Sequence, residues 1–157
     1  MALQDQKIPL YIAPLDRLYE TLKPLSYPLL RIAMGLFYVP HGAQKLFGLW
    51  SGPTVAQLTV GFGRMGAFWG HAGWVYYIAC LEFLGGLLMA AGFLTRIVAF
   101  QFVCFMGTAF FVANAGNGWF WTKGGIEAPG IWGLTCLVIL INGGGRFSID
   151  RAIGREI

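Results

Sequence analysis

Charged residues are scarce in this sequence of 157 residues. Only 11% are Asp, Glu, Lys or Arg, whereas 57% are hydrophobic and 16% are aromatic. A soluble globular domain carries about 25% charged residues, so the composition argues against one. The eleven Lys and Arg residues outnumber the seven Asp and Glu residues and give a net charge of +4, but they form no basic cluster. Nucleic-acid binding needs such a cluster, so we expect no nucleic-acid partner.

Cysteine and histidine are also rare. The three cysteines lie inside apolar stretches, with no C-x-x-C pair and no Cys/His ligand spacing, at Cys80, Cys104 and Cys136. They predict small buried hydrophobic residues and neither a zinc site nor a thioredoxin-like motif. A haem would need the two histidines, His41 and His71, to face each other. We therefore expect no haem, flavin or metal.

The hydrophobic residues gather in four blocks separated by Gly, Pro, Trp and charged residues. A membrane span needs about 20 residues, and blocks near that length lie at about 28–48, 73–93, 96–114 and 128–142. The expected fold is therefore all-α, an integral membrane four-helix bundle over residues 26–145. Residues 1–25 predict a cytoplasmic or interfacial segment with an amphipathic helix, which Pro24 and Pro28 break before the first span. Residues 146–157 are expected to be a cytoplasmic tail.

The distribution of Lys and Arg predicts the orientation. Four spans place both termini on one side of the membrane, and that side would hold eight of the eleven basic residues. The other side would hold only Lys45, Arg64 and Lys123. The positive-inside rule then puts both termini in the cytoplasm, with the Trp-rich connections at the outer face.

Ionisable residues within the predicted spans mark a candidate site, because such residues indicate function by default. Helix geometry places Glu82 of the second span and His41 of the first span at comparable depth near the outer leaflet, with Lys45 one turn further out. We predict a contact between Glu82 and His41. The alternative is an ion pair that only fixes the packing of the first two helices.

Further polar residues are expected near the same outer region. The third predicted span ends at Asn114 and the fourth begins beside Glu127, while Trp121 lies in the connection between them. Together with Lys45, these residues are the candidates for binding a substrate or a quinone.

Three arginines are expected at the opposite, cytoplasmic end. Arg31 lies near the inner end of the first span, where a long side chain can extend to the lipid headgroups. Arg96 and Arg146 flank the later spans. We assign all three a structural, lipid-anchoring role.

Three stretches resemble the DoxX family in order and spacing. They are LLRIAMGLFYVPHGAQKLFG, ACLEFLGGLLMAAGFLTR and GGIEAPGIWGLTCLVILINGGGRFSID. The resemblance covers about residues 28–151 and implies a four-helix protein of the bacterial inner membrane. The family's polar pattern falls on Arg31, His41, Gly42, Lys45, Glu82, Gly85, Gly86, Thr95, Arg96, Glu127, Arg146 and Asp150.

The resemblance also carries functional expectations. The family takes its name from a relative of the small membrane subunits of a thiosulfate:quinone oxidoreductase, and some members are associated with redox or thiol-stress partners. The connections of this chain are richer in aromatic residues than the resemblance leads us to expect. They point to a large protein partner, or a second copy, at the outer face.

Two functions remain as hypotheses. The first is a membrane subunit of a quinone-linked oxidoreductase, thiosulfate:quinone-like or thiol-redox associated, with Glu82 and His41 as catalytic residues that handle protons. A His or Lys can bond a quinone carbonyl while a carboxylate exchanges protons. The alternative is a non-catalytic anchor or assembly subunit of a larger membrane complex. Small-solute transport has less support, because no inverted repeat or pair of broken helices is evident.

Overall fold

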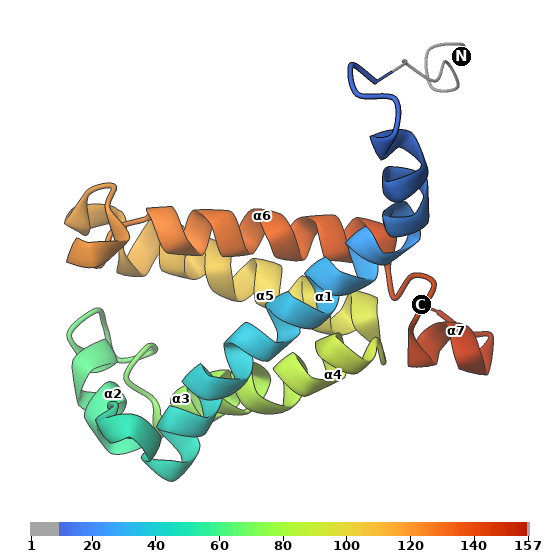
Figure 1. The fold of residues 1–157 in the computed structure, drawn as a ribbon. Coiled ribbons are helices and arrows are strands. Elements are labelled where there is room, and N and C mark those ends of the chain that lie inside the picture. Colours follow the sequence, from blue (N-terminus) through green and yellow to red (C-terminus); the bar gives the residue numbers. More distant parts are fainter. Residues whose placement is uncertain (1–9, 157) are drawn as a thin grey trace.

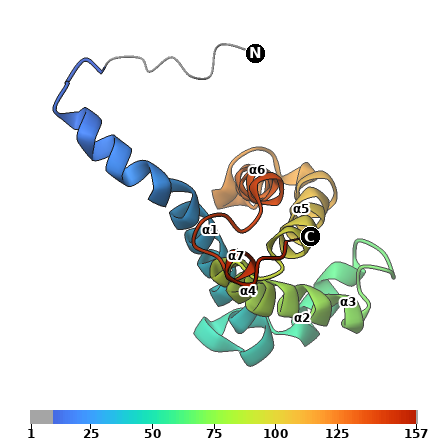
Figure 2. The ribbon, with the colours of Figure 1, turned by 90° about the vertical axis from the view of Figure 1, so that its right-hand side faces the viewer.

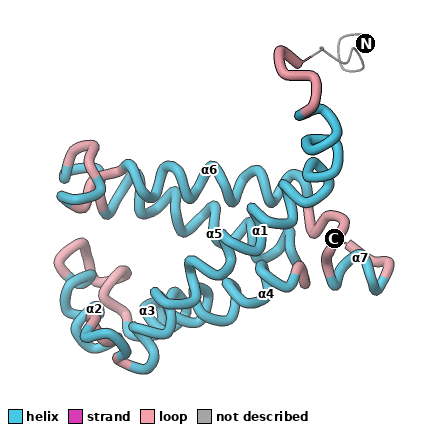
Figure 3. Tube along the Cα trace, in the orientation of Figure 1, coloured by secondary structure: helices cyan, strands magenta, loops and turns pink. Residues whose placement is uncertain are grey.

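The computed structural model describes residues 10–156, and within them the secondary structure is helical throughout, without a strand. This confirms the all-α class. The long elements, drawn in Figures 1 and 3, are α1 (Leu15–Phe47), α5 (Thr95–Thr108), α6 (Glu127–Asn142) and a composite rod. That rod consists of α3 (Ala72–Cys80), the π-helical turn η2 (Leu81–Gly85) and α4 (Gly86–Ala91). Two shorter helices are α2 (Val55–Gly63) and α7 (Ile149–Ile153).

Helix α1 corrects one sequence-based expectation. Pro24 and Pro28 were expected to separate an interfacial helix from the first span, but both lie inside one continuous helix of 33 residues. A proline inside a helix removes one backbone hydrogen bond and bends the axis without always ending it. The first turns of α1 project away from the other helices and run in a different direction from the rest of α1 (Figure 1). Of the predicted segment 1–25, residues 1–9 lie outside the described part of the chain.

Within residues 10–156, two helices have the length and composition to cross a membrane. They are the α3–α4 rod, Ala72–Ala91, and the helix Thr95–Ala113, in which α5 continues into the π-helical turn η3 (Ala109–Ala113). Helix α6 is apolar but shorter, at 16 residues. These three elements coincide with the second, third and fourth apolar blocks of the sequence.

The helices pack as two pairs that share one core. Helix α1 packs along the α3–α4 rod and α5 along α6. Figure 2, in which α6 is seen end-on, shows α5 beside α6 and α4 below them. The shared core includes Tyr38, Met89, Phe102, Cys136 and Ile139. We call the end with the α4–α5 turn and residues 143–156 the tail end. The end with residues 48–71 and 114–126 is the loop end (Figure 1).

Two glycines bring α1 close to the α3–α4 rod. A Cβ atom added to Gly35 would lie 2.6 Å from the backbone nitrogen of Ala90, and one added to Gly42 would lie 2.7 Å from the carbonyl oxygen of Ala79. Both distances are too short for any side chain. Small residues permit this backbone approach between membrane helices, so the glycines set the position of α1 on the rod.

Candidate functional site

An ion pair joins α1 to the α3–α4 rod close to the loop end. Lys45 Nζ donates a hydrogen bond to Glu82 Oε2. The side chains of Lys45 and Glu82 are only 14% and 6% exposed. Two charges removed from water to this extent are each strongly unfavourable alone and are held here as a pair.

The predicted partner of Glu82 was wrong, because Lys45 rather than His41 makes the contact. Side chains on a helix lean toward its N-terminus, so the long Lys45 side chain covers the turn below its own Cα. Lys45 Nζ also lies 3.4 Å from the carbonyl oxygen of His41, to which it donates. Lys45 therefore reaches the depth that Cα spacing assigned to His41.

His41 instead contacts α6. Its ring meets the Trp132 ring edge-on, with centroids 5.3 Å apart and planes at 73°, and the residue is exposed. His41 thus lies beside the Glu82–Lys45 pair, one turn away from Lys45, but in contact with a different helix.

Glu82 occupies an unusual stretch of backbone. It lies in η2, where the Gly86 N–H donates to the Leu81 carbonyl five residues earlier. Single π-helical turns inside α-helices occur frequently at functional sites. The sequence shows Glu82 and two glycines after it but carries no signal for the wider turn.

An aromatic and sulfur layer lies next to the pair. Tyr38 is fully buried, stacks on Phe102 with ring centroids 3.8 Å apart, and meets Trp132 edge-on at 5.0 Å. Its hydroxyl lies 3.5 Å from the Cys136 sulfur. Tyr38 and Trp132 therefore connect α1, α5 and α6, and the sequence analysis did not select either residue. The available signal for Tyr38 was its place one turn from His41 on the same face of α1.

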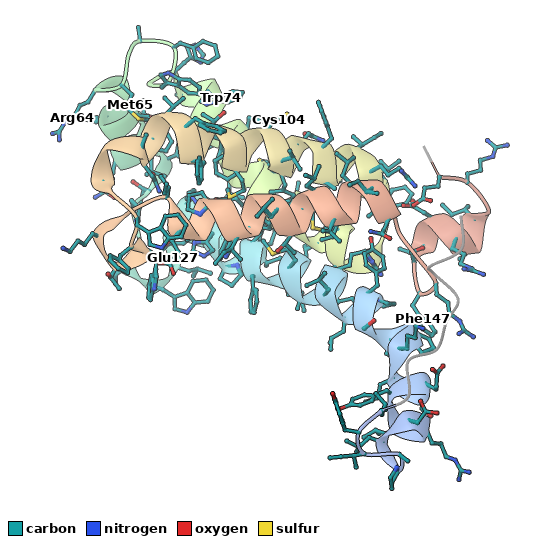
Figure 4. The ribbon with its side chains drawn as sticks, turned by 90° about the horizontal axis from the view of Figure 1, so that it is seen from above. Arg64, Met65, Trp74, Cys104, Glu127 and Phe147 are labelled. Atoms are coloured by element: carbon teal, nitrogen blue, oxygen red, sulfur yellow. The ribbon has the colours of Figure 1, made fainter. Side chains whose placement is uncertain are left out.

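The other predicted binding residues are bonded within their own connection. Asn114 Nδ2 donates to the Gly125 carbonyl at 3.4 Å, and Glu127 Oε2 accepts from the Trp121 backbone N–H at 3.1 Å. Trp121 is 65% exposed. Among residues 10–156, no hydrogen bond or ion pair joins this connection to Glu82 or Lys45. Glu127 does lie at the loop end, as Figure 4 shows.

The lipid-anchoring role predicted for Arg31 was wrong, since Arg31 is fully buried and does not extend to lipid headgroups. One guanidinium nitrogen donates to the Met89 and Ala90 carbonyls at 2.5 and 2.7 Å, and the other donates to the Phe147 carbonyl at 2.6 Å. The carbonyls of residues 89 and 90 lie in the last turn of α4, where a cation is favoured by the helix dipole. Arg31 therefore caps α4 and ties it to the segment after α6.

Asp150 caps the opposite end of the next helix, the N-terminus of α5. It is 4% exposed and accepts hydrogen bonds from Leu94 N at 2.8 Å, Thr95 N at 2.9 Å and Thr95 Oγ1 at 2.7 Å. These donors form the N-terminus of α5, where an anion is favoured. Burial alone would raise the pKa of Asp150, but the hydrogen bonds from Thr95 and Leu94, aided by Arg31, lower it below the ordinary value.

The two remaining arginines lie at the tail end, and their lipid-anchoring role stays a prediction. Arg96 donates to the Leu140 carbonyl at 3.2 Å and lies 3.8 Å from Glu156 Oε2. The guanidinium carbon of Arg146 lies 5.7 Å from the ring centre of Phe147. Figure 4 shows Phe147 at the opposite end from Glu127.

For metal binding, the described part of the chain offers no group of three or more His, Cys, Asp or Glu side chains. The three cysteines are free thiols.

Comparison with known proteins decides the family. The DoxX family model matches residues 27–115, which is more than half of the chain. This chain belongs to the DoxX family. It is therefore a DoxX-family membrane protein, as the sequence motifs led us to expect. The matched range contains Arg31, Lys45 and Glu82 but ends before Glu127 and Asp150. No curated protein and no solved structure matches the chain.

Proposed function

We propose that this DoxX-family protein is the membrane subunit of a quinone-linked oxidoreductase, in which the Glu82–Lys45 pair exchanges protons at a quinone. The proposal places α1, the α3–α4 rod, α5 and α6 across a bacterial inner membrane as a four-span bundle, with both termini in the cytoplasm. A partner subunit supplies electrons from an oxidisable donor such as thiosulfate or a thiol.

The observation that carries the proposal is the buried Glu82–Lys45 pair in a π-helical turn. Replacing a buried ion pair with apolar residues is often neutral or stabilising, so the pair is a poor device for stability. It is also not needed to position α1, because the Gly35 and Gly42 contacts already hold α1 against the rod on the same face. An ion pair that packing does not require, inside a helix apolar enough to span a membrane, favours a chemical role.

The pair and an apolar groove on the other helix pair together suit a molecule with carbonyl oxygens and an apolar chain. A groove of about 320 Å³ runs between α5 and α6, and its lining includes Val103, Met106, Phe110, Pro129 and Leu134. Pro129 lies two residues after Glu127, so the groove approaches the loop end. Trp132, from the same stretch of α6, contacts His41 and Tyr38. An isoprenoid chain fits the groove, whose lining consists of residues of α5, α6 and η3 and does not include His41 or Lys45.

In this role each residue has a separate task. Reduction of a quinone to a quinol takes up two electrons and two protons. Lys45 Nζ, the more exposed partner at 14%, donates a hydrogen bond to a carbonyl oxygen and transfers a proton. Glu82 orients Lys45, accepts a replacement proton and returns it to Lys45, which then transfers the second proton to the quinone. His41, which is exposed, exchanges protons between the pair and water.

The test separates chemistry from helix packing. Glu82→Gln and Lys45→Met each leave one buried partner unpaired and are expected to destabilise the protein by about 3–5 kcal/mol, whereas Glu82→Leu combined with Lys45→Met should restore stability. The proposal expects the double variant to have lost quinone reduction by membranes supplied with thiosulfate or a thiol. It also expects little quinone in the variant purified from mild detergent, as measured by mass spectrometry. If the stable double variant keeps both properties, the pair only packs helices.

A second candidate is the non-catalytic anchor, which one observation favours. Several large aromatic residues at the loop end are 61–68% exposed, namely Trp50, Phe68, Trp119, Phe120 and Trp121. Such residues suit a membrane interface or a partner protein. Replacing Trp119 and Trp121 with Ser should release the partner subunit if the chain is an anchor. His41→Ala should leave that assembly intact under both proposals and should slow quinone reduction only under the first.

A further inference from the structure

We propose that the tail end contains a binding site for a lipid phosphate group, formed by Arg96 and the Gly144 backbone N–H, and that the Glu156 carboxylate fills this site when no lipid is bound. The site is separate from the Glu82–Lys45 pair and does not depend on the proposed function.

The Glu156 carboxylate lies between Arg96 and the Gly144 N–H, at a position that we call the seat. The seat has the features of an oxyanion site. Glu156 Oε1 accepts a hydrogen bond from the Gly144 N–H, and Oε2 lies 3.8 Å from an Arg96 guanidinium nitrogen. A guanidinium and a backbone N–H are common ligands of phosphate groups.

Gly143 leaves the space that this oxyanion occupies. Its φ is +70°, and an added Cβ would overlap the Glu156 carboxylate, with Oε2 only 2.7 Å away. A residue with a side chain at position 143 would therefore close the seat. The seat is also accessible from outside, because the Arg96 and Glu156 side chains are 38% and 36% exposed.

A cleft next to the seat provides room for a larger anion. Its volume is about 310 Å³, and Glu156, Arg151 and Arg155 contribute to its lining. At about 30 Å³ per molecule of liquid water, that space corresponds to about ten waters, which is enough for a phosphate with part of a glycerol. Asp150 also lines the cleft, but its carboxylate is already bonded to Leu94 and Thr95.

The position of the seat favours a lipid as the source of the phosphate. Arg96 is the second residue of the apolar helix Thr95–Ala113, which is long enough to cross a membrane. Its guanidinium therefore lies where a spanning helix emerges among the headgroups. Basic residues outnumber acidic ones in the segments 95–96 and 143–156 at the tail end, with Arg96, Arg146, Arg151 and Arg155 against Asp150 and Glu156, and such an excess attracts anionic lipids.

The experiment removes the charge of Glu156, whose carboxylate would compete with a lipid phosphate for the site. We would place the 157-residue chain in nanodiscs of phosphatidylcholine containing a small fraction of phosphatidylglycerol and measure the phosphatidylglycerol retained by native mass spectrometry. Glu156→Gln should raise retention roughly fivefold, since an exposed ion pair contributes up to about 1 kcal/mol and 1.4 kcal/mol is tenfold. Arg96→Gln should lower retention to the level of phosphatidylcholine. Arg64→Gln, which removes the same charge at the loop end (Figure 4), is the matched control and should change neither.

Three outcomes would overturn the proposal. One is an unchanged retention in Glu156→Gln, a surface change that does not depend on the folding of the Arg96 variant. Another is an equal loss in Arg96→Gln and Arg64→Gln, which would indicate general charge attraction. The third is displacement of phosphatidylglycerol by millimolar inorganic phosphate, which would identify a site for the free anion instead of a lipid.

Discussion

Removing the Asp150 carboxylate should release the N-terminus of α5. The residue at the N-cap position, Leu94, has no side chain able to accept a hydrogen bond and adopts a left-handed conformation with φ 49°. Asp150 supplies the missing acceptor from 55 residues away, bonding Thr95 N and Oγ1 as well as Leu94 N. Its own backbone N–H donates to the Gly92 carbonyl at 2.9 Å.

The expected magnitude follows from those bonds. Asp150→Ala leaves two backbone donors and one hydroxyl without their acceptor, at about 1–3 kcal/mol for each group that stays buried. Because α7 can loosen and admit water, we expect a total of about 3 kcal/mol. Asp150→Asn retains an acceptor and loses the charge, so its cost should be near the typical N-cap value of about 1 kcal/mol.

Hydrogen–deuterium exchange of the protein in detergent or nanodiscs measures this directly. At 1.4 kcal/mol per factor of ten, exchange of the amides at residues 94–97 and 149–153 should accelerate roughly 100-fold in Asp150→Ala and about fivefold in Asp150→Asn. Glu127→Gln, a carboxyl substitution at the loop end, is the control and should leave these amides unchanged. Equal exchange in the wild type and Asp150→Ala would refute the capping role.

The remaining predictions concern pH and helix contacts. Because the pKa of Asp150 is lowered in the folded protein, its contribution should be constant above the unfolded value of about 3.9 and should disappear as pH falls through the lower folded pKa. The protection factors of the amides at residues 94–97, which correct for the intrinsic pH dependence of exchange, should therefore fall only below about pH 4, and a fall between pH 7 and 5 would contradict this. Arg31→Lys should lower the thermal midpoint of unfolding almost as much as Arg31→Met, since one ammonium group cannot replace a guanidinium whose two nitrogens bond three carbonyls. A lysine variant with the wild-type thermal midpoint would contradict this geometry. Gly42→Ala, whose Cβ would lie 2.7 Å from the Ala79 carbonyl, should destabilise by about 1–3 kcal/mol. Gly107→Ala, where nothing lies within 4 Å, should stabilise by about 0.5–1 kcal/mol, and the same loss of stability in both variants would contradict the close approach of α1.

The helices were largely predictable from the sequence, because long apolar blocks are a strong signal. The composite rod, α5 and α6 begin and end close to the apolar blocks 73–93, 96–114 and 128–142. The continuity of α1 through Pro24 and Pro28 was not predictable in this way. A proline weakens a helix locally, and whether the helix bends or ends depends on contacts made by the residues after it.

The candidate site was predictable only in part. Helical spacing placed Glu82 at the same depth as basic residues of α1, which is where it lies. The spacing of Cα atoms could not choose between His41 and Lys45, because the length and lean of the lysine side chain shift its charge by a turn. Arg31 was misassigned for a related reason. Depth along a helix places an arginine near an interface, but only the three-dimensional arrangement reveals the carbonyls of residues 89, 90 and 147 around it.

The capping of the α4–α5 turn by distant residues has a consequence for synthesis on the ribosome. The two apolar helices that flank this turn emerge by residue 113, but one of their caps is contributed by residue 150. Until that residue leaves the ribosomal exit tunnel, the backbone N–H groups at the start of α5 lack the acceptor that Asp150 provides. The docking of residues 147–150 then completes a junction with residues that were synthesised some fifty residues earlier. A nascent chain interrupted before residue 150 would therefore leave the start of α5 uncapped.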